Sequence, residues 1–109
     1  MEEIETEYGL TSILRYSERV CVLFYSSWCR FSRAFLPIFE KYNDEEGSVK
    51  FLRIRLDDQK NPLWKKYSVQ GVPTVILFKR ERVVKRLDPI LGVGLNENQL
   101  KYFLKTEDG

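Results

Sequence analysis

The 109-residue sequence contains no histidine and only two cysteines. Without histidine, every Cys-His or Ser-His catalytic pair and the usual zinc-ligand sets are excluded. Two cysteines are also too few for a disulfide scaffold in a chain of this length. Any nucleophilic chemistry must therefore come from a thiol, a hydroxyl, a carboxylate or a lysine, and we expect neither a metal nor a cofactor.

The sequence also lacks a large charge excess, a long apolar run and a basic leader. Lys and Arg number 18 and Asp and Glu 16, a net charge of +2, whereas nucleic-acid-binding domains usually have a strongly basic face. The longest apolar run is residues 20–25, far short of the roughly 18 residues that suggest a membrane span. The first seven residues hold four glutamates, where a secretory signal would be basic and then apolar. We therefore expect a cytoplasmic monomer with neither a nucleic-acid nor a membrane partner.

Apolar periodicity divides the chain into alternating helices and strands, with no linker or repeat to indicate a second domain. Ile4, Tyr8, Ile13 and Leu14 fit an early amphipathic helix, and residues 20–25 are typical of a strand buried on both faces. The pattern then predicts a helix over 31–42 kinked at Pro37, a polar turn at 43–47 and a strand at 49–57. After these come a short helix at 62–67, a hairpin of strands 73–78 and 83–87, and a C-terminal helix capped by Asn96. This order predicts a single α/β domain over residues 1–109, in which helices cover both faces of a mixed four- to five-stranded sheet.

A cysteine stands where the apolar strand gives way to the amphipathic helix. The segment reads Phe24-Tyr25-Ser26-Ser27-Trp28-Cys29-Arg30-Phe31-Ser32. A helix N-terminus carries partial positive charge and unpaired N–H groups, both of which stabilise a thiolate. Arg30 adds a positive charge, and Ser32 lies one turn on, where its hydroxyl could donate to the sulfur. From these residues alone, Cys29 is either a reactive thiol or a structural cysteine.

The stretch from Phe24 to Cys29 resembles the active-site strand and loop of the thioredoxin superfamily. Gly71-Val72-Pro73-Thr74 is similar to the cis-proline loop of that family, at the separation from the cysteine that the family shows. Pro37 matches the kink in the family's active-site helix. The resemblance spans roughly residues 10–105 and implies the thioredoxin fold, a nucleophilic Cys29 and a cis peptide bond before Pro73. Residues 1–7 match least, so we expect the family's first strand to be short or absent.

Two positions depart from the thioredoxin pattern. The second cysteine of the family's Cys-x-x-Cys motif is Ser32 here, and a hydroxyl cannot resolve a mixed disulfide. The family's buried acid falls at Leu23, so Arg53, which stands where the family has a lysine paired with that acid, is left without an evident partner. Cys21 lies roughly 13 Å before the end of its extended strand, too far to form a disulfide with Cys29, and is predicted to be buried apolar filler.

These observations favour thiol–disulfide exchange by a single thiol. Cys29 would form a mixed disulfide with a protein, a peptide or glutathione, and an external thiol would resolve it. The predicted catalytic residues are Cys29 and Ser32, and the predicted substrate contacts are Trp28, Arg30, Phe31, Val72 and Pro73.

Two other functions remain as alternatives. One is a redox-inactive module that keeps the thioredoxin fold and binds another protein through the surface around Trp28 and Pro73. The other follows from the segment Cys29–Ser32, which differs by one residue from the Cys-Gly-Phe-Ser of monothiol glutaredoxins. Those proteins bind a [2Fe–2S] cluster with glutathione, but Arg30 in place of glycine should crowd such a site.

Overall fold

The computed structural model describes residues 1–43 and 47–106, so residues 44–46 of the expected polar turn lie outside the described part. Five strands form one mixed sheet in the order β1-β3-β2-β4-β5. β3 runs parallel to β1 and to β2, whereas β4 runs antiparallel to β2 and to β5. The strands are β1 (Glu2–Ile4), β2 (Arg19–Tyr25), β3 (Lys50–Arg55), β4 (Thr74–Lys79) and β5 (Arg82–Leu87).

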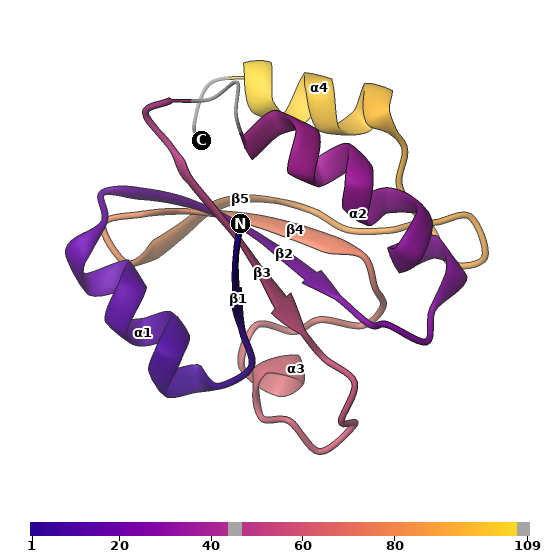
Figure 1. The fold of residues 1–109 in the computed structure, drawn as a ribbon, viewed down its shortest axis with the longest axis horizontal. Helices are drawn as coiled ribbons and strands as arrows, with labels where there is room; N and C mark the ends of the chain where they lie inside the picture. The colour runs from indigo at the N-terminus through magenta and orange to yellow at the C-terminus, as the bar shows by residue number, and fades with distance from the viewer. Residues whose placement is uncertain (44–46, 107–109) are drawn as a thin grey trace.

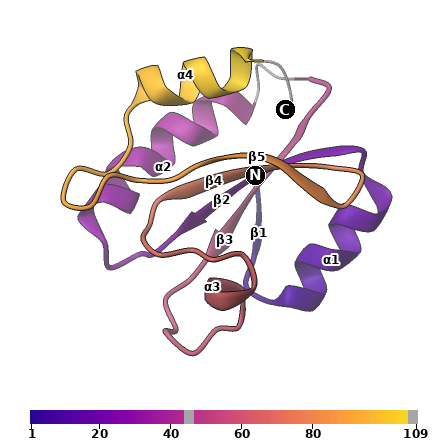
Figure 2. The same ribbon diagram turned by 180° about the vertical axis from the view of Figure 1, so that it is seen from behind.

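Four helices cover the two faces of this sheet. They are α1 (Glu7–Tyr16), α2 (Arg30–Asn43), α3 (Leu63–Lys66) and α4 (Glu97–Lys105). α2 and α4 lie on one face, and α1 and α3 lie on the other, as the two opposite views show (Figures 1 and 2). The expected α/β architecture with a mixed sheet is therefore confirmed, with five strands.

β2 is the middle strand and supplies both halves of the core. Its residues alternate between two buried clusters, because successive side chains of a strand point to opposite faces of the sheet. Val20, Val22 and Phe24 belong to the cluster that contains α1 residues Leu10 and Leu14. The cluster on the other face contains Cys21, Leu23 and Tyr25 from β2 together with α2 and α4 residues Phe35, Phe39, Leu100 and Phe103. Burial on both faces explains why residues 20–25 are apolar without a break.

The start of the chain differs from the expected early helix. Ile4 belongs to β1, which pairs with β3, and the helix begins only at Glu7. Thr6 stops the helix from extending further back, because its side chain accepts a hydrogen bond of 3.0 Å from the Gly9 N–H. The apolar face of α1 is carried by Leu10 and Leu14, whereas Tyr8 is exposed.

The C-terminal helix begins where its sequence predicts. The Asn96 side chain accepts from the Gln99 N–H at 2.9 Å, and the Gln99 side chain accepts from the Asn96 N–H at 2.8 Å. This capping box satisfies two backbone donors at the start of α4. Among the described residues, no helix combines the length and the apolar character that crossing a membrane requires.

Candidate functional site

A four-residue loop connects β2 to α2. In its first residue, Ser26, the N–H, the hydroxyl and the carbonyl are all hydrogen-bonded. The Ser26 N–H donates to Ser32 Oγ at 3.2 Å, and Ser26 Oγ donates to the Leu56 carbonyl at 2.8 Å. The Ser26 carbonyl accepts from the Cys29 N–H at 3.3 Å. Since Ser26 is fully buried, each of these bonds forms where water cannot compete, and together they set the position from which Cys29 starts α2.

Ser27, the next residue, is held just as fully by charged side chains. Its N–H donates to Asp57 Oδ1 at 2.8 Å and its hydroxyl donates to Asp57 Oδ2 at 2.5 Å. Its carbonyl accepts from Arg33 Nη1 at 3.2 Å. Burial would raise the pKa of Asp57, but the two hydrogen bonds from Ser27 and the charge of Arg55 outweigh it and lower that pKa below its ordinary value. The carboxylate is therefore the form that anchors the loop to the end of β3.

Cys29 immediately precedes α2, and its thiol lies against the loop before β4. Its carbonyl accepts from the Arg33 N–H at 3.0 Å, which closes the first turn of the helix. The sulfur is partly buried and lies 3.7 Å from the Val72 carbonyl oxygen, to which the thiol donates. The Val72–Pro73 peptide bond is cis. A hydrogen bond of 2.7 Å spans it, donated by Thr74 Oγ1, which follows the cis bond, to the Gly71 carbonyl, which precedes it. The fold therefore brings Cys29 together with Val72 and Pro73, which are 43 residues and more away in sequence.

The other sequence-predicted contacts are the chain neighbours of Cys29, and their surroundings differ. Trp28 is 55% exposed. The Arg30 guanidinium lies over the Phe31 ring, 4.9 Å from its centroid, so the cation stacks on an aromatic face. Phe31 itself packs against Gly94: a Cβ atom at that glycine would lie 2.9 Å from the Phe31 Cβ. Phe31 is thus a packing contact between α2 and the loop that precedes α4.

Ser32 is fully buried, and its described hydrogen bond joins it to the loop backbone. The hydroxyl oxygen accepts from the Ser26 N–H, and its donation to the sulfur of Cys29 stays a prediction. The position that holds the second cysteine in dithiol thioredoxins thus carries here an oxygen that supports the preceding loop.

Arg53, whose partner the sequence left open, forms ion pairs with two glutamates. It lies opposite Leu23 in the register of β2 and β3. Its Nε is 3.0 Å from Glu3 Oε1, and its Nη1 contacts Glu40 Oε1. The Tyr25 hydroxyl donates to the same Glu3 carboxylate. Burial, followed by this hydrogen bond and the charge of Glu3, raises the pKa of Tyr25 to about 12.

The two cysteines pack against different buried clusters. Cys21 is fully buried in the cluster beneath α2 and α4, whereas Cys29 packs against the cluster beneath α1. Among the described residues, no group of three or more His, Cys, Asp or Glu side chains is arranged to hold a metal ion.

Sequence reasoning missed the residues that support the site. These are Ser26, Ser27 and Asp57, which fix the loop, and Gly94, which packs against Phe31. The available signals were the Ser-Ser pair before Trp28 and the closely spaced glycines Gly92 and Gly94. Neither signal identifies its partner, because the partner lies on a different element.

Comparison with known proteins finds sequence matches that cover most of the chain. A family model described as Thioredoxin matches residues 4–106. Endoplasmic reticulum resident protein 44 of Homo sapiens is 33% identical over 90 residues, which cover 76% of this chain but only 22% of that protein. A thioredoxin of Acidithiobacillus ferridurans is 29% identical over 98 residues, covering 89% of this chain and 86% of that protein.

Solved structures share the fold over nearly their whole length. A Plasmodium falciparum thioredoxin has a TM-score of 0.82 at 20% identity, covering 96% of this chain and 97% of its own. A mutant Entamoeba histolytica thioredoxin has a TM-score of 0.82 at 26% identity, covering 98% of this chain and 99% of its own. The backbone arrangement around Cys29 therefore belongs to a widely shared architecture.

Proposed function

The chain belongs to the thioredoxin family, and from that premise we propose that Cys29 carries out thiol–disulfide exchange as a single thiol. The observation that carries the proposal is the position of its sulfur. It lies at the start of α2, partly exposed, and 3.7 Å from the Val72 carbonyl oxygen. The substrate is a disulfide-bonded protein or peptide, or oxidised glutathione.

The first step is the attack of the Cys29 thiolate on one sulfur of the substrate disulfide. A bond forms between Cys29 Sγ and that sulfur, and the original disulfide bond breaks. Its second sulfur leaves as a thiolate, so that the number of disulfides is unchanged and one electron pair moves to the leaving group.

The second step needs a thiol from outside the chain. Ser32 offers a hydroxyl in place of a second thiol, and Cys21 is fully buried in the cluster beneath α2 and α4. An external thiolate must attack the sulfur of the bound substrate, which restores the Cys29 thiolate and releases a new disulfide. Since that step is bimolecular, the mixed disulfide should accumulate when no external thiol is supplied.

The substrate chain would lie along the surface that surrounds the sulfur. Val72 and Pro73 form one side of it, and the exposed indole of Trp28 extends the other. Arg30 and Phe31 stack on each other at the first turn of α2 and complete its edge. Ser32 supports the loop from beneath, through the Ser26 N–H.

The test is adduct formation with oxidised glutathione under excess of that disulfide. Mass spectrometry of the native protein should find one glutathione per chain, on Cys29. The variant Cys29→Ser should form no adduct, whereas the matched variant Cys21→Ala should form as much as the wild type. A wild-type protein that stays unmodified under excess disulfide would contradict the proposed exchange. A protein partner captured equally well by wild type and Cys29→Ser would show that the site binds without exchanging thiols.

A further inference from the structure

The β4–β5 hairpin concentrates positive charge at one end of the sheet. Residues 79–86 carry five basic side chains and one acidic one, a net charge of +4 against +2 for the whole chain. The basic residues are Lys79, Arg80, Arg82, Lys85 and Arg86. Lys79 pairs with Arg19 at the start of β2, whereas Cys29 follows the end of that strand. The tip of the hairpin is therefore remote from Cys29, and both ribbon views show it beside the segment between α1 and β2 (Figures 1 and 2).

The tip is a two-residue turn that charged side chains occupy at a free-energy cost. Lys79 and Arg82 pair across it, and the residues between them, Arg80 and Glu81, have positive φ angles of 51° and 71°. Asparagine and glycine are the usual residues in such a turn, because most other side chains are strained at positive φ. The Arg80 N–H donates to the Glu18 carbonyl at 2.8 Å, which holds the turn in place. Strain of this kind is common where exposed side chains serve a function.

β5 is also an open edge of the sheet. It pairs with β4 on one side, and no strand of the described residues pairs with its other side. The strand is six residues long and contains no proline, and Val83 within it is 45% exposed. Such an edge is a template for a further strand. Basic side chains along it repel a strand of the same charge and attract a strand that carries carboxylates.

A groove of about 400 Å³ opens between β5 and α4. β5 contributes Lys85, Arg86 and Leu87 to its lining, and α4 contributes Tyr102 and Phe103. A strand added to the β5 edge would extend the sheet beside α4, since neighbouring strands lie only about 4.8 Å apart. Alternate side chains of that strand would point toward α4, and the groove is placed to receive them.

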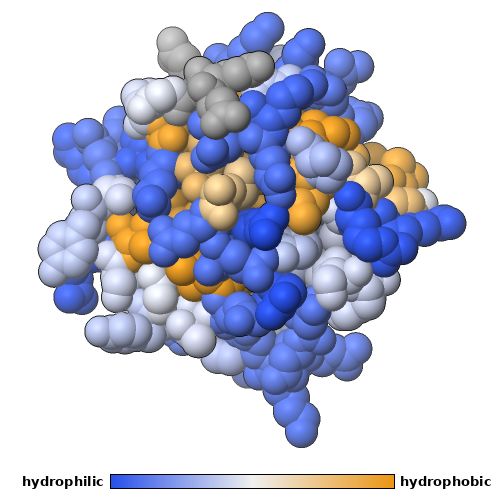
Figure 3. Space-filling view, in the orientation of Figure 1, coloured by the Kyte–Doolittle hydropathy of each residue, from blue (hydrophilic) through white to orange (hydrophobic). Residues whose placement is uncertain are grey.

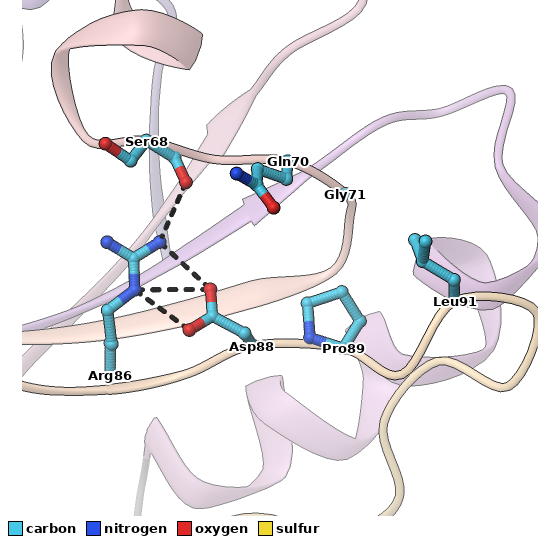
Figure 4. A pocket seen from close by; sticks show the side chains of 7 residues that line it. All are labelled: Ser68, Gln70, Gly71, Arg86, Asp88, Pro89 and Leu91. Atoms are coloured by element: carbon cyan, nitrogen blue, oxygen red, sulfur yellow. Dashed lines mark hydrogen bonds and ion pairs between the residues drawn. The ribbon is translucent and has the colours of Figure 1, made fainter.

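The two basic side chains that line the groove are engaged within the protein. Lys85 Nζ donates to the Thr106 carbonyl at 2.8 Å, just after α4. Arg86 Nη2 lies 2.9 Å from Asp88 Oδ1, and Figure 4 shows this ion pair beside the Ser68 carbonyl, to which Arg86 Nη2 also donates. Both side chains therefore give the groove their aliphatic stems, so that it suits an apolar side chain of a ligand.

Two other cations flank the same groove. Arg82 begins β5 and Lys105 ends α4, and both are exposed. In the part of the chain that the structure describes, no ion pair engages either of them. They lie toward the same end of the groove, because Lys85 of β5 bonds to Thr106 just after α4. Their charges are available to the carboxylates of a bound segment.

We propose that the β5 edge binds an extended acidic segment of a partner protein by strand addition. The backbone of the segment pairs with β5, its carboxylates meet Arg82 and Lys105, and an apolar side chain enters the groove beside Tyr102. Hydrophilic side chains predominate on the face seen in Figure 3, and hydrophobic ones form separate patches there, so backbone pairing and charge provide the specific contacts. The inference goes beyond the exchange at Cys29 and does not depend on it.

A second copy of this chain fits the edge less well. Its β5 carries the same positive charge, so that pairing of two β5 edges brings like charges together. Its other edge strand, β1, has only three residues, and Glu3 within it already forms an ion pair with Arg53. A segment of a partner protein has neither restriction.

The test measures the binding of three fluorescent peptides of equal length by fluorescence anisotropy. One alternates valine with glutamate, the second alternates valine with glutamine, and the third is the glutamate peptide N-methylated at every second residue. The glutamate peptide should bind at least about tenfold more tightly than either of the others, because glutamine removes the charge and N-methylation removes the donors that face β5. Amide hydrogen exchange of residues 82–87 should slow when the glutamate peptide binds.

Variants of the full chain locate the site. Arg82→Glu reverses one charge on the edge and should weaken binding of the glutamate peptide about tenfold. The matched control is Lys60→Glu, an equal change at an exposed residue between β3 and α3, which should alter the affinity less than about twofold. Cys29→Ser should bind as tightly as the wild type, and a loss there would place the peptide at the exchange site and overturn the proposal.

Equal affinities for the glutamate and glutamine peptides, or equal losses in Arg82→Glu and Lys60→Glu, would also overturn it. Tight binding of the N-methylated peptide would show contact without strand addition, against the proposal. An oligonucleotide or phosphatidylserine vesicles that bind through Arg82 while the glutamate peptide does not would assign the hairpin to another polyanion. An oligomer of the wild type that Arg82→Glu dissociates in sedimentation would assign the edge to a second copy, and either result would refute a partner segment.

Discussion

Ser32 occupies the position of the second cysteine in the thioredoxin motif, and its side-chain oxygen supports the loop before Cys29. Its oxygen accepts the hydrogen bond of the buried Ser26 N–H, and a buried backbone donor left without a partner costs about 1–3 kcal/mol. The residue therefore stabilises the loop that places Cys29. It does so without offering a second thiol, which is why an external thiol enters the proposed reaction.

Replacing this serine by cysteine should change how the reaction ends. In Ser32→Cys a second thiolate can attack the mixed disulfide on Cys29 and release the bound group, because that attack is intramolecular. Mass spectrometry after addition of oxidised glutathione should find the adduct in the wild type and less than about a tenth as much in the variant. Equal accumulation in both proteins would mean that a thiol at position 32 cannot reach the disulfide.

At the scale of elements, the site depends on a contact between the turn at 88–94 and α2. Gly94 lies so close to Phe31 that the space of a side chain is already filled. Gly92 has the same sign of φ, but nothing lies within 4 Å of where its Cβ would be. Substituting the two glycines in turn therefore separates the free-energy cost of a side chain at positive φ from the cost of its clash with Phe31.

Alanine substitutions at these glycines should differ in their effect on stability. Gly92→Ala should lower the free energy of unfolding by about 1–2 kcal/mol, because of its positive φ alone. Gly94→Ala should lower it by about a further 1–3 kcal/mol, because the new methyl group meets the Phe31 side chain. Urea denaturation of both variants measures the difference, and equal losses would contradict the packing of the turn against α2.

On the scale of the whole molecule, one carboxylate joins three strands. Glu3 in β1 contacts Arg53 in β3 and accepts from the Tyr25 hydroxyl at the end of β2. Arg53 also reaches Glu40 in α2, so the short edge strand is connected to the central strand and to a helix. The pKa of Tyr25 is raised to about 12 by burial and by this carboxylate, against an ordinary value near 10.

This connection should make stability decrease at high pH. A group whose pKa is higher in the folded state stabilises the fold fully below its unfolded pKa and loses that contribution as the pH rises through its folded pKa. The contribution of Tyr25 should therefore be complete below about pH 10 and be lost toward about pH 12. Denaturation between about pH 9 and pH 11.5 should show a smaller decline in Tyr25→Phe than in the wild type. The same decline in both proteins would show that Tyr25 does not couple to folding.

The sequence by itself determined the features that depend on near neighbours. The unbroken apolar residues of β2, the Asn96–Gln99 capping box and the position of Cys29 between strand and helix each follow from residues within a few positions of one another. The early helix was misplaced at Ile4, because pairing of β1 with β3 competes there with helical periodicity. An edge strand of three residues is too short for its alternation of apolar and polar side chains to predict a strand.

Only the tertiary structure decided which distant residues meet. One partner of Arg53 is Glu3, 50 positions away, and this ion pair forms only once β1 lies beside β3. The Ser27–Asp57 bond and the contact of Gly94 with Phe31 likewise join elements separated by long stretches of chain. Such pairs form because the order of the strands and the packing of the helices bring them together. That arrangement minimises exposed apolar surface over the whole chain, so no local segment contains it.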